Sequence, residues 1–363
     1  MTRKVALVMA GGTGGHVFPA LATARVLQSR GFDVVWLGTE RGIEARLVPA
    51  AGIPVEWLSV GGLRGKGFAT LLAAPVRLGV AIAQAMRAIR KHQPRVVLGA
   101  GGFASGPGGI AAWLLRRPLV VHEQNAVAGL TNRVLARFAT RVLEGFPGSF
   151  GRGVKAERVG NPVRPEIVAI APPERRYAGR AGRARLLVFG GSQGAARLNA
   201  VLPAAIGELP PELRPDVLHQ TGRHNFDETV QAYRARGIEA DVRPFIDDMA
   251  SAYGWADLAV CRSGALTVAE LAAAGVPAVL VPFPAAVDDH QTRNAEYAVH
   301  AGAARLLPEA QLTPISLAAV LRELLEQGRP TFERMAHAAR GTAIVDADVR
   351  LADACLQAAG EAA

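Results

Sequence analysis

Four glycines and a histidine directly follow the first apolar run of the chain, in the stretch "VALVMAGGTGGHVFPALATARVLQ". Glycine lets a backbone approach a ligand closely, and a helix that begins at such a turn presents unpaired N–H groups and a partial positive charge. This combination suits a phosphate or diphosphate. His16 stands beside the glycines, and an imidazole can serve as a general base near neutral pH. A packing turn without a ligand is the alternative for any single loop of this kind.

Two further glycine-rich stretches follow apolar runs, "GAGGFASGPGG" at 99–109 and "FGGSQGAARLN" at 189–199. The dinucleotide fingerprint G-x-G-x-x-G is not met, because Val17 stands where its third glycine belongs. No lysine followed by Ser or Thr comes after a glycine loop, so the Walker A pattern is also missing. The loops therefore predict phosphate binding without a nicotinamide or P-loop motif.

The stretch "CRSGALTVAELAAAGVPAVLVPFPAAVDDHQTRNAEY" joins a strand, a tight turn and a helix over 265–274 that Gly275 and Pro277 terminate. The start of this helix can hold a diphosphate. Glu270, one turn in, can accept hydrogen bonds from a ribose diol. Gln291 and Asn294, in the polar segment that follows, can bind sugar hydroxyls and amides. An ordinary strand–helix–strand unit with a polar loop is the alternative.

Short apolar runs alternate with helical patterns in both halves of the chain. Continuously apolar strands separated by helices indicate parallel sheets covered on both faces. We therefore expect an α/β protein with two Rossmann-like, doubly wound domains facing a deep cleft. The expected strands are 5–10, 33–38, 95–100, 118–123, 185–190, 216–220, 258–262 and 277–282, and the expected helices include 20–28, 78–91 and 266–274.

The domain boundary is expected near Asn161–Arg164. We expect an N-terminal domain over 1–162 and a C-terminal domain over 163–342, with a last helix at about 343–363 packing back on the first domain. Glycine loops after the first strand of each half form a weak internal repeat. "APPERRYAGRAGRA" lies between the halves and predicts a linker or surface loop.

The 363 residues include 41 Lys and Arg against 31 Asp and Glu, a formal charge of +10. This balance favours anionic partners, although no basic stripe interleaved with aromatics suggests nucleic acid. Cys261 and Cys355 are too few and too far apart for a disulfide framework, which fits a reducing cytosol. We expect neither a signal peptide nor a spanning segment, since no run reaches about 18 apolar residues. The chain is thus expected to be soluble or to lie on a membrane surface.

Seven motifs together closely resemble MurG-type transferases of glycosyltransferase family 28: GGTGGHVFPALA, GGFASGPGG, HEQNAVAGLTNR, VGNPVR, FGGSQGA, RSGALTVAELAAAGVPAVLVPFP and DDHQTRNA. The resemblance runs from about Val5 to Leu307. It implies the GT-B fold and an inverting transfer in peptidoglycan synthesis. In that reaction GlcNAc moves from UDP-GlcNAc to the C4 hydroxyl of the MurNAc of undecaprenyl-pyrophosphoryl-MurNAc-pentapeptide (lipid I), which gives lipid II.

The resemblance also implies binding residues. In it Ile246 meets uracil through its backbone, Glu270 holds the ribose, and Ser192 and Arg164 meet donor phosphate or sugar. The implied UDP-GlcNAc residues are Thr13, Gly14, Gly15, Asn125, Arg164, Ser192, Ile246, Ala265, Leu266, Thr267, Val268, Ala269, Glu270 and Gln291. The implied residues for the acceptor's pyrophosphate are Gly12, Gly14, Gly15, Gly101 and Gly102.

An acceptor hydroxyl that attacks a sugar carbon needs a base. His16 is the first candidate, and Glu123 and His122 are the reserves. We expect no metal site and no tightly bound cofactor, with UDP-GlcNAc as co-substrate. The one Asp-x-Asp pair, Asp346 and Asp348, lies outside the motif region and is interpreted as surface.

A lipid-anchored acceptor would require contact with a bilayer. Apolar residues edged with basic ones over 63–92 and 113–118 suit an anionic membrane surface, although a core helix with a basic solvated face has the same pattern. The predicted membrane face includes Phe68, Leu71, Leu72, Arg77, Trp113 and Arg116. These features predict a peripheral protein on the cytoplasmic face of the inner membrane, with other membrane cell-wall enzymes as further candidate partners and no nucleic acid.

Three alternatives remain open from the sequence. One is another sugar transferase of the same fold, and the second is a UDP-GlcNAc epimerase, for which the basic apolar face has no explanation. The third is a catalytically silent membrane scaffold for cell-wall enzymes. Intact Glu270, Gln291 and His16 argue against the scaffold.

Overall fold

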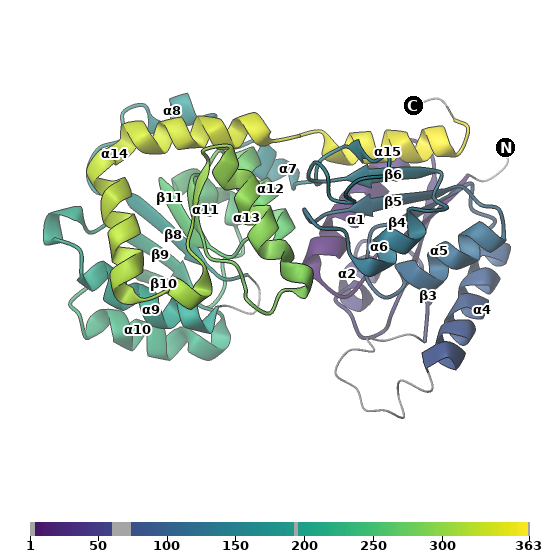
Figure 1. Cartoon of the computed structure of the whole chain (residues 1–363), viewed down its shortest axis with the longest axis horizontal. Coiled ribbons are helices and arrows are strands. Elements are labelled where there is room, and N and C mark those ends of the chain that lie inside the picture. Colours follow the sequence, from purple (N-terminus) through teal and green to yellow (C-terminus); the bar gives the residue numbers. More distant parts are fainter. Residues whose placement is uncertain (1–3, 60–73, 192–194, 362–363) are drawn as a thin grey trace. The chain divides into compact units, whose positions relative to one another are not determined.

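The computed structural model describes residues 4–59, 74–191 and 195–361. Within it the chain forms two compact units, Met1–Val163 with Ile344–Ala363, and Arg164–Ala343. Each unit is built on one parallel sheet, and Figure 1 follows the chain through both. The expected fold class, two doubly wound α/β domains, is confirmed.

The N-terminal unit has a seven-stranded sheet in the order β3-β2-β1-β4-β5-β6-β7. Its elements are β1 (Val5–Met9), α1 (Gly14–Ser29), β2 (Asp33–Gly38), α2 (Glu44–Ala50), β3 (Val55–Trp57), α4 (Ala74–His92), β4 (Val96–Gly99), α5 (Ser105–Leu114), β5 (Leu119–Glu123), α6 (Leu130–Leu135), β6 (Arg141–Glu144), β7 (Glu157–Arg158) and α15 (Ala347–Ala358). Helix α1 starts at Gly14, earlier than the predicted residue 20, because Pro19 is accommodated inside its early turns.

Alternation along β1 divides the interior of this unit into two cores. Ala6 and Val8 point into a core shared with α1, α2 and α15. Leu7 and Met9 point into the opposite core, against α4 and α5. Successive side chains of a strand face opposite sides of its sheet, so a strand that is apolar throughout must be covered on both faces. Figure 1 shows α15, in yellow, beside β5 and β6 of this unit.

The C-terminal unit has a six-stranded parallel sheet in the order β10-β9-β8-β11-β12-β13. Its elements are α7 (Pro165–Val168), α8 (Pro173–Tyr177), β8 (Arg185–Phe189), α9 (Ala196–Gly207), β9 (Asp216–Gln220), α10 (Phe226–Arg234), β10 (Asp241–Arg243), α11 (Met249–Trp255), β11 (Leu258–Cys261), α12 (Ala265–Ala274), β12 (Ala278–Leu280), α13 (His290–His300), β13 (Ala304–Leu306) and α14 (Pro314–Thr342). Helix α14 is broken at Gly328, whose φ of 65° no helical residue adopts.

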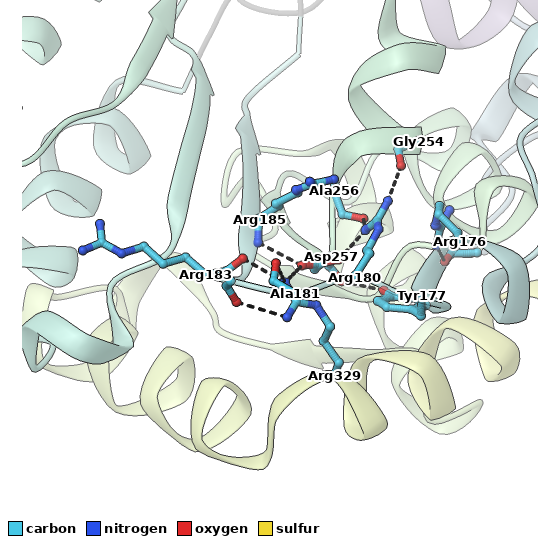
Figure 2. A network of polar contacts seen from close by, with 12 residues as sticks. Arg176, Tyr177, Arg180, Ala181, Arg183, Arg185, Gly254, Ala256, Asp257 and Arg329 are labelled. Carbon is cyan, nitrogen blue, oxygen red and sulfur yellow. Dashed lines mark hydrogen bonds and ion pairs between the residues drawn. The ribbon is translucent and has the colours of Figure 1, made fainter.

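A network of polar contacts centres on a buried carboxylate in the C-terminal unit (Figure 2). Asp257, just before β11, is fully buried and forms ion pairs with Arg180 and Arg329. It also accepts the N–H of Arg185 at 3.1 Å, and its carbonyl accepts the Tyr177 hydroxyl at 2.8 Å. The segment predicted as a linker or surface loop instead contains α8 and belongs to the C-terminal unit, where its own Tyr177 and Arg180 bind Asp257.

We expect Asp257→Asn to lower the free energy of unfolding by about 3 kcal/mol, because two guanidinium groups lose their buried counter-charge. Urea unfolding followed by far-UV circular dichroism measures the change. The matched control is Asp241→Asn, which breaks an exposed pair with Arg243 and should cost no more than about 1 kcal/mol. Equal effects of the two substitutions would contradict a structural role for the Asp257 network.

Candidate functional site

The strand order of the N-terminal sheet reverses between β1 and β4, and each of these strands ends in a glycine loop. Ligands of open α/β sheets bind at the carboxyl ends of the strands at such a point. Gly101 and Gly102 adopt φ values of 92° and 84°, which favour glycine. A Cβ at Gly102 would collide with the backbone of Gly11. The two loops thus touch backbone to backbone and form one continuous surface.

A buried carboxylate supports the first glycine loop from below. Glu44, at the start of α2, is fully buried and accepts the N–H of Gly12 at 2.9 Å. It also accepts the Thr39 hydroxyl at 2.7 Å. The amide of Gly12 is consequently occupied and sits against a carboxylate, which makes it a poor ligand for the acceptor pyrophosphate predicted there. Gly14 and Gly15 begin α1, and their N–H groups have no hydrogen-bond partner within the described ranges.

His16 lies in the first turn of α1 and is half-buried. Its Nδ1 is 2.9 Å from Oε1 of Gln124, just after β5. A Cβ on Gly101 would lie 2.6 Å from the same Nδ1, so the second glycine loop packs closely against the ring. The ring's Nε2 makes no hydrogen bond to any described residue. Gln124 and Gly101 thus contact the predicted base on its Nδ1 side, and Nε2 is left without a hydrogen bond to any described residue.

The two reserve bases are poorly placed for chemistry. His122 is fully buried, and burial lowers its pKa to about 4. Glu123 is also buried and accepts the N–H of Asn125 at 2.9 Å and the side-chain amide of Asn132 at 2.8 Å. Both side chains hold the loop after β5, where Asn125 is half-buried. Thr13, the N-cap of α1, is exposed.

The C-terminal sheet reverses its strand order between β8 and β11. The loop after β8 contains Ser192, which lies outside the described residues. The loop after β11 leads through the buried Ser263 into α12. Ser263 donates its hydroxyl to the carbonyl of Gln291 at 2.8 Å, and this contact joins the α12 turn to α13. The two predicted donor motifs that follow β8 and β11 therefore lie at the same edge of the sheet.

Glu270 is the centre of a polar cluster at α12. Arg164 donates to its Oε1 from Nη2 at 3.0 Å and from Nε at 3.2 Å. Tyr253, from α11, donates its hydroxyl to the Oε2 at 3.1 Å. Burial raises the pKa of the Glu270 carboxyl above its ordinary value, and the Arg164 guanidinium partly opposes this. The cluster holds the carboxylate of Glu270 in a fixed orientation.

The remaining predicted donor residues described in this unit lie on α12 and α13, except Ile246, which lies between β10 and α11. Leu266, Thr267 and Ala269 are half-buried, whereas Ala265 and Val268 are buried. Gln291 uses its Oε1 to accept the N–H of Phe283 at 3.0 Å. Ile246 is 4% exposed, so a ligand could meet it chiefly through the backbone.

Of the predicted membrane residues, Arg77 lies on α4, Trp113 lies on α5 and Arg116 follows α5, and these two helices pack together. Exposed apolar side chains gather in the first turns of α4, at Val76, Leu78 and Val80. Trp113 is 53% exposed at the end of α5. Arg77 and Arg116 are exposed beside these two groups. Phe68, Leu71 and Leu72 lie outside the described residues.

Models of two known domains match this chain. The glycosyltransferase family 28 N-terminal domain matches residues 6–144, and the glycosyltransferase family 28 C-terminal domain matches residues 185–351. The chain belongs to glycosyltransferase family 28. Both glycine-loop edges described above fall inside the matched ranges. The family resemblance stated from the sequence motifs is thereby confirmed.

Family 28 relatives match over nearly the full length of the chain. A protein of Nitrosococcus oceani, named UDP-N-acetylglucosamine–N-acetylmuramyl-(pentapeptide) pyrophosphoryl-undecaprenol N-acetylglucosamine transferase, is 57% identical over 97% of this chain and 98% of its own. The crystal structure of MurG from Acinetobacter baumannii matches with a TM-score of 0.87 and 40% identity, covering 98% of this chain and 99% of that one. A UDP-GlcNAc 2-epimerase of Neisseria meningitidis shares the fold alone, with 12% identity and a TM-score of 0.67, over 98% of this chain and 100% of that one.

Three residues of the family 28 site were not predicted from the sequence. Glu44, Gln124 and Tyr253 contact predicted residues from positions far away in the chain. Gln124 could have been predicted from the sequence. It directly follows a buried strand near the point where the strand order reverses, and ligands bind at that edge of the sheet. Glu44 and Tyr253 lie within helical segments and had no such signal.

Gly101→Ala should displace the His16 ring, because the new Cβ would overlap it. We expect kcat for sugar transfer to fall roughly tenfold or more, as misplaced catalytic groups commonly cause. Gly52→Ala is the matched control, since Gly52 also has a positive φ of 75° but nothing within 4 Å of an added Cβ. Both variants carry a backbone strain of about 1–2 kcal/mol, and only the first should lose turnover. Normal turnover in Gly101→Ala would refute the close packing of this loop on His16.

Proposed function

We propose that this chain transfers GlcNAc from UDP-GlcNAc to the C4 hydroxyl of the MurNAc of lipid I, with inversion, to give lipid II for peptidoglycan synthesis. The observation that carries the proposal is the 57% identity, over nearly the whole chain, to a relative named for that transfer. Glycine loops and helix starts at both points of strand reversal supply the phosphate-binding surfaces that a nucleotide sugar and a lipid diphosphate need.

The donor is assigned to the C-terminal unit. The amides in the first turn of α12 can bind a diphosphate, and the fixed carboxylate of Glu270 can accept hydrogen bonds from the ribose diol. Arg164, 42% exposed at its side chain, can turn part of its guanidinium toward phosphate. Gln291 keeps its side-chain N–H₂ for a sugar oxygen while its Oε1 is held by Phe283. Ile246 supplies backbone groups for uracil.

The acceptor pyrophosphate is assigned to the amides of Gly14 and Gly15, together with the Gly101–Gly102 loop. Nε2 of His16 takes the proton of the C4 hydroxyl as the hydroxyl oxygen forms a bond to C1 of GlcNAc. The bond from C1 to the UDP oxygen breaks on the opposite side, and UDP leaves with the electron pair. The configuration at C1 is thereby inverted. Arg164 and the α12 amides would stabilise the charge that develops on UDP.

Transfer of labelled GlcNAc to a short-chain lipid I analogue tests the proposal, with a muramyl-free polyprenyl phosphate as the control acceptor. We expect label in a disaccharide lipid with the lipid I analogue alone, and a loss of roughly 10²–10⁴ in kcat in His16→Ala with donor affinity retained. We also expect no tightly bound ion to be needed, so a chelator should leave activity in place. UDP-GlcNAc binding without transfer would refute the proposal and favour the scaffold, and donor epimerisation without acceptor would favour the epimerase.

We further propose that the α4 and α5 surface meets the anionic cytoplasmic face of the inner membrane. The exposed apolar groups beside Arg77 and Arg116 support this, since basic residues near anionic headgroups and apolar side chains at the acyl boundary both favour binding. No helix within the described ranges is long and apolar enough to cross a bilayer.

Charge reversal at both arginines, Arg77→Glu with Arg116→Glu, should weaken binding to phosphatidylglycerol-containing vesicles at least about tenfold, at about 1 kcal/mol per basic residue. Vesicle co-sedimentation measures the effect. Arg234→Glu on α10, an exposed position of the C-terminal unit, is the matched control. Binding of the wild type that ignores anionic lipid content would refute the proposed surface.

A further inference from the structure

A chain of hydrogen bonds runs behind His16 into the interior of the N-terminal unit. It begins at the carbonyl oxygen of Gly160, which lies 2.9 Å from Nε2 of His122. A carbonyl oxygen only accepts, so this nitrogen carries a proton. Burial lowers the pKa of His122 to about 4, so its ring is neutral near neutral pH. Nδ1 of His122 is therefore unprotonated and accepts a hydrogen bond.

Gln124 provides the next link. Its side-chain nitrogen lies 3.1 Å from Nδ1 of His122 and 3.0 Å from the carbonyl oxygen of Ala100. Both neighbours are acceptors, and an amide nitrogen has two protons to donate. The two contacts together fix which end of the amide is nitrogen. Oε1 of Gln124 consequently points at His16, 2.9 Å from its Nδ1.

This oxygen decides the state of the His16 ring. Because an amide oxygen only accepts, Nδ1 of His16 must carry a proton. In the neutral ring the proton is then absent from Nε2, which makes no hydrogen bond to any described residue. A histidine free in water prefers the opposite tautomer, with the proton on Nε2, and that tautomer cannot take a proton there. The partner of one ring nitrogen commonly sets the state of the other.

We propose that Gln124 is a positioning residue that holds His16 in the tautomer whose Nε2 is unprotonated, and that His122 with the carbonyls of Gly160 and Ala100 fixes Gln124 for this purpose. The role of Nε2 as a base rests on the proposed function, whereas the tautomer itself does not. When Nε2 takes a proton, the Nδ1–H bond to Gln124 is retained.

The partner of His16 is a neutral amide, although a carboxylate is next to it in the sequence. Glu123 is occupied by the amides of Asn125, Gly129 and Asn132. A carboxylate against Nδ1 would place a negative charge beside the ring and favour the imidazolium. An amide orients the ring without placing a charge beside it.

Two-bond ¹H–¹⁵N spectra of the protein labelled at its eight histidines test the tautomer directly, with the His16 signal assigned by its loss in His16→Gln. In the wild type we expect a protonated Nδ1 and an unprotonated Nε2. Gln124→Met removes the acceptor and should shift the ring toward the Nε2–H tautomer. Gln124→Glu loses the same two donated bonds but still accepts from Nδ1, so the wild-type tautomer should persist. A wild-type ring with its proton on Nε2, or Met and Glu variants with the same tautomer, would overturn the proposal.

Kinetics give a second readout. Gln124→Met should lower kcat roughly 10- to 100-fold, within the ~10²–10⁴ that a general base supplies, and leave the KM for UDP-GlcNAc unchanged. Gln124→Glu should recover part of that loss, because its carboxylate still accepts a hydrogen bond from Nδ1–H of His16. Gln28→Met, at an exposed position near the end of α1, is the matched control. A Met variant with wild-type kcat, or one whose loss appears in KM, would overturn the positioning role.

The proposed function and the positioning role of Gln124 can be refuted by different results. Wild-type protein without any transfer would refute the proposed function, and turnover retained in His16→Ala would refute the base. Neither result changes the spectra, which judge the hydrogen-bonded chain alone. Far-UV circular dichroism of each Gln124 variant confirms that the fold is retained, so a change in tautomer reports on Gln124 and not on unfolding.

Discussion

The N-terminal site depends on a backbone contact between the glycine loop after β4 and the glycine loop after β1. The two loops lie too close together for a side chain to fit between them. Parallel strands bring both loops to the same edge, and positive backbone angles at Gly101 and Gly102 let them touch. The contact places the Gly101 backbone against His16. The carboxylate of Glu44 holds the first loop from the other side. The orientation of the histidine is therefore a property of several segments that are distant in the sequence.

The two units use the same architecture with different chemistry. At the edge of the N-terminal sheet, the histidine contacts the neutral groups of Gln124 and Gly101, and the nearby carboxylate of Glu123 accepts hydrogen bonds from amides. At the edge of the C-terminal sheet, Arg164 forms an ion pair with Glu270. The side chain of Arg164 is partly exposed to solvent, whereas that of Glu270 is buried. A proton acceptor benefits from a neutral setting, whereas a nucleotide diphosphate benefits from a nearby cation. Strand order alone does not determine this difference, which comes from the residues after each strand.

The sequence predicted what depends on local pattern. The eight expected strands, the helix over 265–274 and the glycine loops after β1 and β4 have strong apolar periods or glycine signals, and the structure contains them. Short edge strands such as β3 and β7 lack such a period. The contacts of Gln124 with His16 and of Glu44 with Gly12 join residues 108 and 32 positions apart, so no spacing rule could reveal them. Burial of Glu123 and His122 was likewise invisible, since a polar residue at a strand end can face either way.

Helix α15 places the last part of the chain in the core of the first unit. Leu351, Cys355 and Leu356 are buried beside residues of β1 and α1, while Arg164–Ala343 forms its own compact unit in between. During synthesis the C-terminal unit is complete once residue 343 has left the ribosome, whereas the N-terminal unit still has an uncovered apolar face at that moment. The unit translated first is consequently the one that finishes folding last, and a chain cut before residue 344 would expose the interior of the domain at its opposite end.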